Sequence, residues 1–111
     1  MIRDILFAIE LTSKLLKDKD LKLNNVVERI SQESTVPIEE ILGKSRRQHI
    51  VTLRQTAYYV YRHRFGLTYS SIADLTNRLD HTTVMHGLKT MENYLQVYGI
   101  HTDKPNLGGY V

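Results

Sequence analysis

The chain has 111 residues, of which 41% are hydrophobic and 24% charged, values typical of a single folded domain rather than a disordered or membrane protein. Cysteine is absent from the sequence, which excludes disulfide bonds, Cys-ligated zinc and thiol catalysis. Residues 1–43 hold six Lys or Arg against eight Asp or Glu (−2), residues 44–98 hold eight against three (+5), and this basic second half favours a polyanionic partner.

Helical spacing of apolar residues and capping signals predict up to six helices. Their expected ranges, in chain order, are 2–17, 26–34, 37–43, 47–65, 68–76 and 80–97. Asn24 or Asn25 is the expected cap of the second helix. Pro37 suits the first position of the third helix, which Gly43 can end. Asp80 is the expected cap of the last helix.

The predicted helix over residues 47–65 has two different faces. Apolar residues at helical spacing form the expected buried face: Ile50, Leu53, Ala57, Val60, Tyr61 and Phe65. The opposite face gathers polar and basic residues with one aromatic: Arg47, Arg54, Gln55, Tyr58 and Arg62. We expect Tyr61 in the core and Tyr58 near a nucleic acid, because tyrosines on a long helix usually divide between core and surface.

The last two predicted helices are separated by a tight turn over residues 77–79. The inward residues of the short helix before the turn are expected to be Ile72, Ala73 and Leu75. The packing face of the long helix after the turn repeats at helical spacing and comprises Val84, Leu88, Met91 and Leu95. Residues 99–111 combine glycine, proline and polar residues without periodicity, which predicts a flexible tail.

These elements predict an all-α fold, because no segment shows the sustained apolar and polar alternation of a strand. We expect a compact bundle of about five to six helices in a single domain over residues 1–98. Within it, residues 1–22 form an extra N-terminal helix and joint, and residues 24–98 form the core. Residues 68–97 have the layout of a helix-turn-helix, whose second helix enters the major groove of DNA.

The first residues of the last helix carry groups that can read bases. They are Asp80, His81, Thr82 and Thr83. A carboxylate can accept from cytosine N4, and threonine offers both a hydroxyl and a methyl group. The free start of a helix also attracts phosphate. A plain structural interpretation is equally open, in which Asp80 only caps the helix and the threonines fill a polar first turn.

Three segments together carry a family resemblance. They are Asp80-His81-Thr82-Thr83-Val84-Met85-His86, the pair Arg54-Gln55, and the basic segment Lys44-Ser45-Arg46-Arg47. Over roughly residues 25–95 the chain resembles the C-terminal DNA-binding domain of the bacterial replication initiator DnaA. The resemblance implies a cytoplasmic, nucleoid-associated protein, and its expected partner is double-stranded DNA at a DnaA-box-like site such as a replication origin.

The resemblance also implies groove-reading roles for matching residues. Arg46, in the basic segment, is expected to enter the minor groove. The expected readers of the major groove are Asp80, His81 and Thr82, and Thr83 is a further polar contact. The site implied by the resemblance is therefore read from two grooves at once.

A second set of matching residues is expected to hold the DNA without reading it. Arg54 and Gln55 match the arginine-glutamine pair that holds DNA on the long helix. Lys89 is placed to reach a phosphate, and Ser70 and Ser71 lie where the preceding helix meets the backbone. Further basic residues extend the candidate DNA surface: Lys44, Arg47 and Arg62.

The chain also departs from the family pattern. Leu79 stands where the family usually has an arginine preceded by glycines, and Asn77-Arg78 replaces those glycines. The family often has a proline at the position of Ser70, and residues 56–59 are bulkier than usual. We therefore expect a DNA site that differs from the family's own. Full-length initiators carry an ATPase module, which these 111 residues do not contain, so we expect DNA recognition without it.

A second hypothesis belongs to a different functional class. The broad apolar face of the helix over residues 2–17 must pack on the domain itself or on another molecule. In the second case the chain is a regulatory module that dimerises with a second copy or docks a replication protein, with weak or no DNA binding.

Enzymatic and metal-binding functions are not expected, nor is a cofactor or a membrane partner. Residues 43–45 resemble the end of a phosphate-binding loop, but the required earlier glycine is replaced by Ile38. His81 and His86 miss the i, i+4 spacing of helical zinc ligands, and a third ligand is missing nearby.

Overall fold

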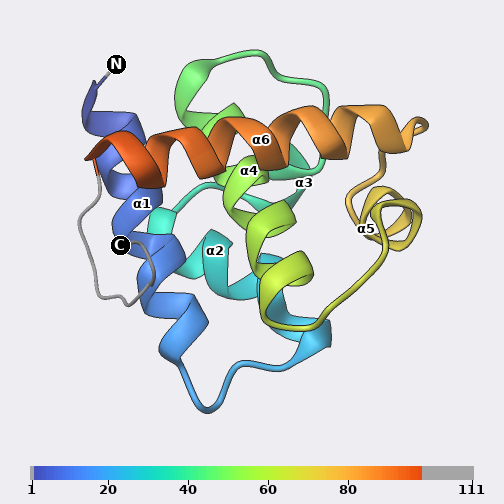
Figure 1. Cartoon of the computed structure of the whole chain (residues 1–111), viewed down its shortest axis with the longest axis horizontal. Coiled ribbons are helices and arrows are strands. Elements are labelled where there is room, and N and C mark those ends of the chain that lie inside the picture. The colour runs from blue at the N-terminus through green and yellow to red at the C-terminus, as the bar shows by residue number, and fades with distance from the viewer. Residues whose placement is uncertain (1, 99–111) are drawn as a thin grey trace.

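The computed structural model describes residues 2–98, which form six α-helices and one short 3₁₀ helix and contain no strand (Figure 1). The elements are α1 (Ile2–Lys17), η1 (Leu23–Asn25), α2 (Val26–Ser34), α3 (Ile38–Ile41), α4 (Gln48–His63), α5 (Tyr69–Leu75) and α6 (His81–Tyr98). The all-α prediction and its helix order are confirmed. The predicted flexible tail, residues 99–111, lies outside the described residues. Of the helices described, none is long and apolar enough to cross a membrane.

Helix α4 is the centre of the fold. It packs against each of the other five α-helices (Figure 1). Helix α6 crosses over it, running from α5 at its N-terminal end to α1 at its C-terminal end. Because neighbours surround α4, it is buried on more than one face. Arg54 is 7% exposed and Tyr58 is 3% exposed, so the prediction that both lie on an open outer face is wrong.

Helix α1 is part of the same core, since it packs on both α4 and α6. Its buried residues are Ala8, Ile9, Leu11, Thr12 and Leu15. At the crossing with α4 the Thr12 hydroxyl donates to the Ala8 carbonyl at 2.7 Å and lies 3.1 Å from the Thr56 hydroxyl. Such pairing is needed because a buried hydroxyl without a partner costs free energy. The domain itself thus covers the inner face of this helix.

Two ion pairs and one hydrogen bond to a side-chain amide stabilise the connection between α1 and α2. Arg29 pairs with Asp18 at 2.6 Å, and Lys14 pairs with Glu33 at 2.7 Å. Asn25 precedes α2 as predicted, but its side chain does not cap that helix. Its Oδ1 instead accepts from the Lys22 backbone N–H at 2.9 Å, which closes the preceding turn.

Candidate nucleic-acid interface

Helices α5 and α6 form the predicted helix-turn-helix. The Thr68 hydroxyl caps α5 by accepting from the Ser71 backbone N–H at 3.1 Å. Thr76 ends the helix and is buried, its hydroxyl donating to the Ile72 carbonyl at 2.7 Å. Asn77 then adopts a φ of 60°, a left-handed conformation that asparagine tolerates better than most residues. The chain turns there, and α5 packs against α6.

Asp80 starts α6 as a cap, as predicted. Its Oδ1 accepts from the Thr82 backbone N–H at 2.9 Å, and its carbonyl accepts from Thr83 at 3.1 Å. The Thr82 backbone N–H, and secondarily the Thr82 hydroxyl, lower the pKa of Asp80, so the carboxylate is ionised at neutral pH. Asp80, His81, Thr82 and Thr83 are all exposed. Capping therefore leaves this edge open to a partner.

The basic loop, residues 42–47, links α3 to α4. Lys44, Arg46 and Arg47 are exposed on it. The Ser45 hydroxyl accepts from the Arg47 backbone N–H at 3.2 Å and tightens the turn before α4. Within residues 2–98 the Arg46 side chain takes part in no hydrogen bond or ion pair, which leaves its guanidinium available to a ligand.

Two arginines hold the basic loop from beneath. Arg54 Nε donates to the Ile41 carbonyl at 2.6 Å, and its Nη2 donates to the Ser45 carbonyl at 2.7 Å. Arg78 Nη2 donates to the carbonyls of Leu42 at 2.8 Å and Gly43 at 2.5 Å. Burial, and then the nearby charge of Arg78, lower the pKa of Arg54. Both groups bind neutral carbonyls, so their positive charge still adds to the field at the loop.

A groove of about 250 Å³ lies between α4 and α6, beside the start of α6. It is lined by Val51, Arg54, Gln55, Tyr58, Thr83, His86, Gly87 and Thr90. The groove brings Gln55 together with Thr83, which sequence analysis had assigned to separate parts of the site. The Gln55 Oε1 atom is buried and has no hydrogen-bond partner among the described residues.

The other predicted site residues lie farther out. Ser70, Ser71 and Lys89 are exposed, and the Ser71 hydroxyl lies 3.0 Å from the Thr68 hydroxyl that caps α5. Arg62 is half-buried instead of projecting outward. Its Nη1 donates to the Leu67 carbonyl at 2.8 Å, and its guanidinium lies 4.7 Å from the centre of the Tyr69 ring. These contacts tie Arg62 to the link between α4 and α5 and away from the basic loop.

The sequence analysis did not include Arg78, His86 and Gly87 among the candidate site residues, although Arg78 and His86 lie in segments that it singled out. Arg78 carries no local signal, since its carbonyl partners lie 35 and 36 residues earlier in the chain. Gly87 did carry one, because a glycine inside a helical pattern marks a close approach of another element. Leu79, where the resemblance implies an arginine, is fully exposed.

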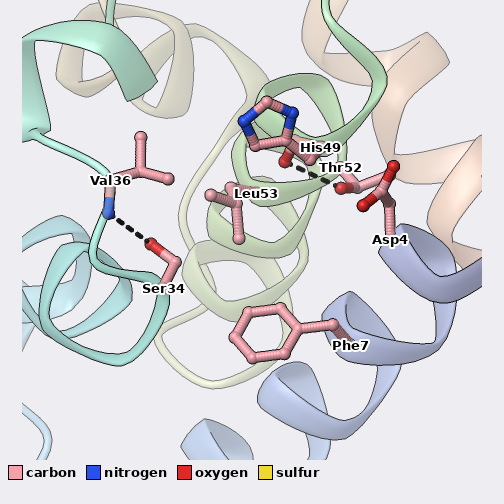
Figure 2. A pocket seen from close by; sticks show the side chains of 7 residues that line it. All are labelled: Asp4, Phe7, Ser34, Val36, His49, Thr52 and Leu53. Carbon is pink, nitrogen blue, oxygen red and sulfur yellow. Dashed lines mark hydrogen bonds between the residues drawn. The ribbon is translucent and has the colours of Figure 1, made fainter.

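A second cavity, of about 220 Å³, lies between α1, the end of α2 and the start of α4 (Figure 2). Its apolar lining is Phe7, Val36 and Leu53, and its polar lining is Asp4, Ser34, His49 and Thr52. The polar groups partly satisfy one another. Thr52 Oγ1 donates to the His49 carbonyl at 3.0 Å, and Ser34 Oγ accepts from the Val36 N–H at 3.2 Å (Figure 2). Within residues 2–98, no group of three metal-ligating side chains is close enough to hold an ion.

The comparisons with known proteins agree with the helix-turn-helix geometry. The family model described as "Bacterial dnaA protein helix-turn-helix" matches residues 23–91. Three similar relatives are chromosomal replication initiator proteins DnaA. That of Thermomicrobium roseum is 37% identical over 71 residues, 64% of this chain and 15% of the relative. That of Picosynechococcus sp. is 43% identical over 63 residues, 56% of this chain and 14% of the relative.

The third, from Porphyromonas gingivalis, is 27% identical over 96 residues, which are 85% of this chain and 20% of the relative. The chain thus spans a fifth or less of the length of these curated relatives. The search of solved structures gave no significant match.

Proposed function

Because this chain belongs to the family of bacterial DnaA helix-turn-helix domains, we propose that it binds double-stranded DNA and recognises a short, DnaA-box-like sequence. The observation that carries the proposal is the pairing of two exposed elements. The polar edge of α6, residues 80–83, and the basic loop, residues 42–47, are joined by Arg78. A reader of two adjacent grooves needs two such elements at a fixed spacing.

In the proposed complex the start of α6 lies in the major groove. Asp80 accepts from an exocyclic amine such as cytosine N4 while it continues to cap the helix. His81 and Thr82 contact neighbouring base edges. Thr83, which also lines the protein groove between α4 and α6, supplies a further polar contact to the DNA. The exposure of all four side chains supports this arrangement.

In the same complex the basic loop lies at the adjacent minor groove, and other groups hold the phosphates. Arg46 enters the groove, where arginine is favoured by the negative potential. The expected phosphate contacts are Lys44, Arg47, Ser70, Ser71, Gln55 and Lys89. Arg54 acts in this arrangement through the loop that it holds, because its side chain is buried under it.

The biological setting that we propose is an origin of replication or a similar DNA element. The relatives are named as chromosomal replication initiators, and the family match covers the part of this chain that holds the candidate interface.

Selection of bound duplexes from a random DNA pool tests the proposal directly. We expect one enriched sequence, with binding that weakens steeply as salt is added, because phosphate contacts release counterions. His81→Ala or Thr82→Ala should cost about 1–3 kcal/mol of discrimination at one or two base pairs. Lys89→Ala should instead weaken binding to all sequences alike. Equal losses on selected and random duplexes in every variant would overturn sequence recognition.

A second candidate function is suggested by the outer face of α1. Ile2, Leu6 and Phe7 are 46%, 41% and 42% exposed, and Phe7 also borders the cavity in Figure 2. Exposed apolar residues that cluster in this way are typical of a contact with a second copy or with another protein. Sedimentation analysis of the wild-type chain and of Phe7→Ser separates the two functions, since DNA binding should survive that substitution.

A further inference from the structure

Given the DNA-binding function proposed above, on which this inference rests, we propose that Arg78 is a positioning residue that fixes the basic loop against the turn before α6 and so sets the spacing between Arg46 and the reading edge at Asp80. Neither the family match nor the departures from the family pattern assign Arg78 a role. Its position in the turn places its backbone next to one DNA-facing element, and its side chain ends at the other.

The backbone of Arg78 is anchored in the helix-turn-helix. Its N–H donates to the Ala73 carbonyl at 2.8 Å, which closes the end of α5. Its Nε donates to the Thr76 carbonyl at 3.0 Å, which fixes the start of the side chain against the same turn. The guanidinium is thereby pre-oriented before it reaches the loop.

The far end of the side chain holds the basic loop. Nη2 donates to the Leu42 and Gly43 carbonyls, which lie four and three residues before Arg46. Arg54 holds the adjoining carbonyls of Ile41 and Ser45. Residues 41–45 are thus held by two guanidinium groups, one from α4 and one from the turn that leads into α6. The Arg78 guanidinium binds the turn through Nε and the loop through Nη2, and arginine, unlike lysine, holds such donors in one fixed plane.

This connection matters for binding two grooves at once. The exposed Arg46 lies on a short segment without regular structure, and such a segment loses conformational freedom when its side chain enters a groove. A loop that is already held at the correct spacing has less freedom to lose. Without Arg78, Arg46 should therefore contribute much less to affinity, whereas contacts made by α6 alone should persist.

A double-mutant cycle on the selected duplex tests this coupling. We expect Arg46→Ala to weaken binding by about tenfold or more in the wild-type background but by less than about threefold in Arg78→Gln. Lys89→Ala lies on α6 and should cost the same in both backgrounds. Arg64→Gln is the matched control, because Arg64 Nη1 also donates to two backbone carbonyls, those of Leu15 and Leu16 at 3.0 and 3.2 Å, near the opposite end of α4. It should leave the Arg46 penalty unchanged.

A measurement without DNA tests the same link. Lys44, Arg46 and Arg47 are trypsin sites on the loop. We expect cleavage after them to be at least about fivefold faster in folded Arg78→Gln than in wild type, and unchanged in Arg64→Gln, because proteolysis follows local opening. If Arg78→Gln fails to fold, Arg78→Lys replaces it in both the binding cycle and the cleavage measurement. Lysine keeps the positive charge but lacks the planar guanidinium, so the same changes should be seen with a smaller size.

The outcomes separate the two proposals. If the wild-type chain selects no DNA sequence, the proposed function fails, while faster loop cleavage in the Arg78 variant would still support the positioning contact. If the wild type selects a sequence but the Arg46 penalty is equal in both backgrounds, the positioning role of Arg78 is refuted and the function stands.

Discussion

The ring of Tyr58 fills the space that a side chain at Gly87 would need. A β-carbon added at Gly87 would lie 2.5 Å from both Cδ2 and Cε2 of Tyr58, closer than such atoms approach in real proteins. Helices α4 and α6 therefore meet through one large and one absent side chain. The bulk of Tyr58 is thus accommodated in the helix crossing.

We expect Gly87→Ala to destabilise the protein. In a helix, alanine is normally more stabilising than glycine by about 1 kcal/mol. Overpacking against Tyr58 should cost about 1–3 kcal/mol and outweigh that gain. Urea denaturation measures the change. In a Tyr58→Leu background, where the ring is gone, the same Gly87→Ala substitution should become neutral or favourable. A loss of equal size in both backgrounds would show that the ring is not the cause.

Because the backbone at Asn77 is left-handed, alanine and glycine at this position should have different effects on the free energy of unfolding. Asn77→Ala should lower the free energy of unfolding by roughly 1 kcal/mol, because alanine keeps the β-carbon that disfavours a φ of 60° but lacks the short polar side chain that lets asparagine adopt it. Asn77→Gly should leave it within a few tenths of a kcal/mol, because glycine adopts positive φ readily. Asn93→Ala, on the exposed side of α6, is the control and should not destabilise. Thermal unfolding of the three variants would contradict this account if Ala and Gly at position 77 behaved alike.

Asp80→Asn separates the capping role of this residue from its proposed reading role. Asparagine caps helices about as well as aspartate, so the free energy of unfolding should change by less than about 0.5 kcal/mol. The amide, unlike the carboxylate, also donates hydrogen bonds, so the preferred base pair at one position of the selected DNA site should change. Parallel unfolding and duplex-selection measurements give both answers. An unchanged preference would assign Asp80 to capping alone.

His63 predicts a pH dependence of stability. Partial desolvation lowers its pKa below the ordinary value of 6.5, although the side chain is 43% exposed, and Glu92 opposes this effect, its Oε2 lying 3.8 Å from the His63 Nε2. A group with a lower pKa in the folded state contributes stability above its unfolded pKa, and that stability is lost as pH falls. The loss of unfolding free energy between about pH 8 and about pH 5.5 should thus be smaller in His63→Gln than in wild type. Equal losses would mean that protonation of His63 is not involved.

Local pattern was sufficient to locate the helices. The predicted ranges 2–17 and 26–34 coincide with α1 and α2, because an apolar stripe and a change of composition at each end define them without reference to the rest of the fold. The exposed edge at residues 80–83 was also predictable, since capping and polarity are local properties. What these residues do with DNA remains a prediction from the family resemblance.

The wrong predictions concern residues whose burial depends on tertiary contacts. Arg54 and Tyr58 were assigned to an outer face on the assumption that a helix buries one stripe, but α4 is covered from several sides. Leu75 was expected inside and is 44% exposed, because α5 has only seven residues and buries Ile72 and Ala73 instead. Periodicity identifies the apolar face of a helix, but it does not show how many other helices will pack around that helix.

The central place of α4 has a consequence for how the molecule opens. Since each of the other α-helices in residues 2–98 rests on α4, its backbone amides cannot meet solvent unless several neighbours detach together. Hydrogen exchange in the middle of α4 should therefore proceed only through global unfolding. The helix-turn-helix and α1 then belong to one cooperative unit, so that weakening the Thr12–Thr56 crossing should speed hydrogen exchange in the middle of α4.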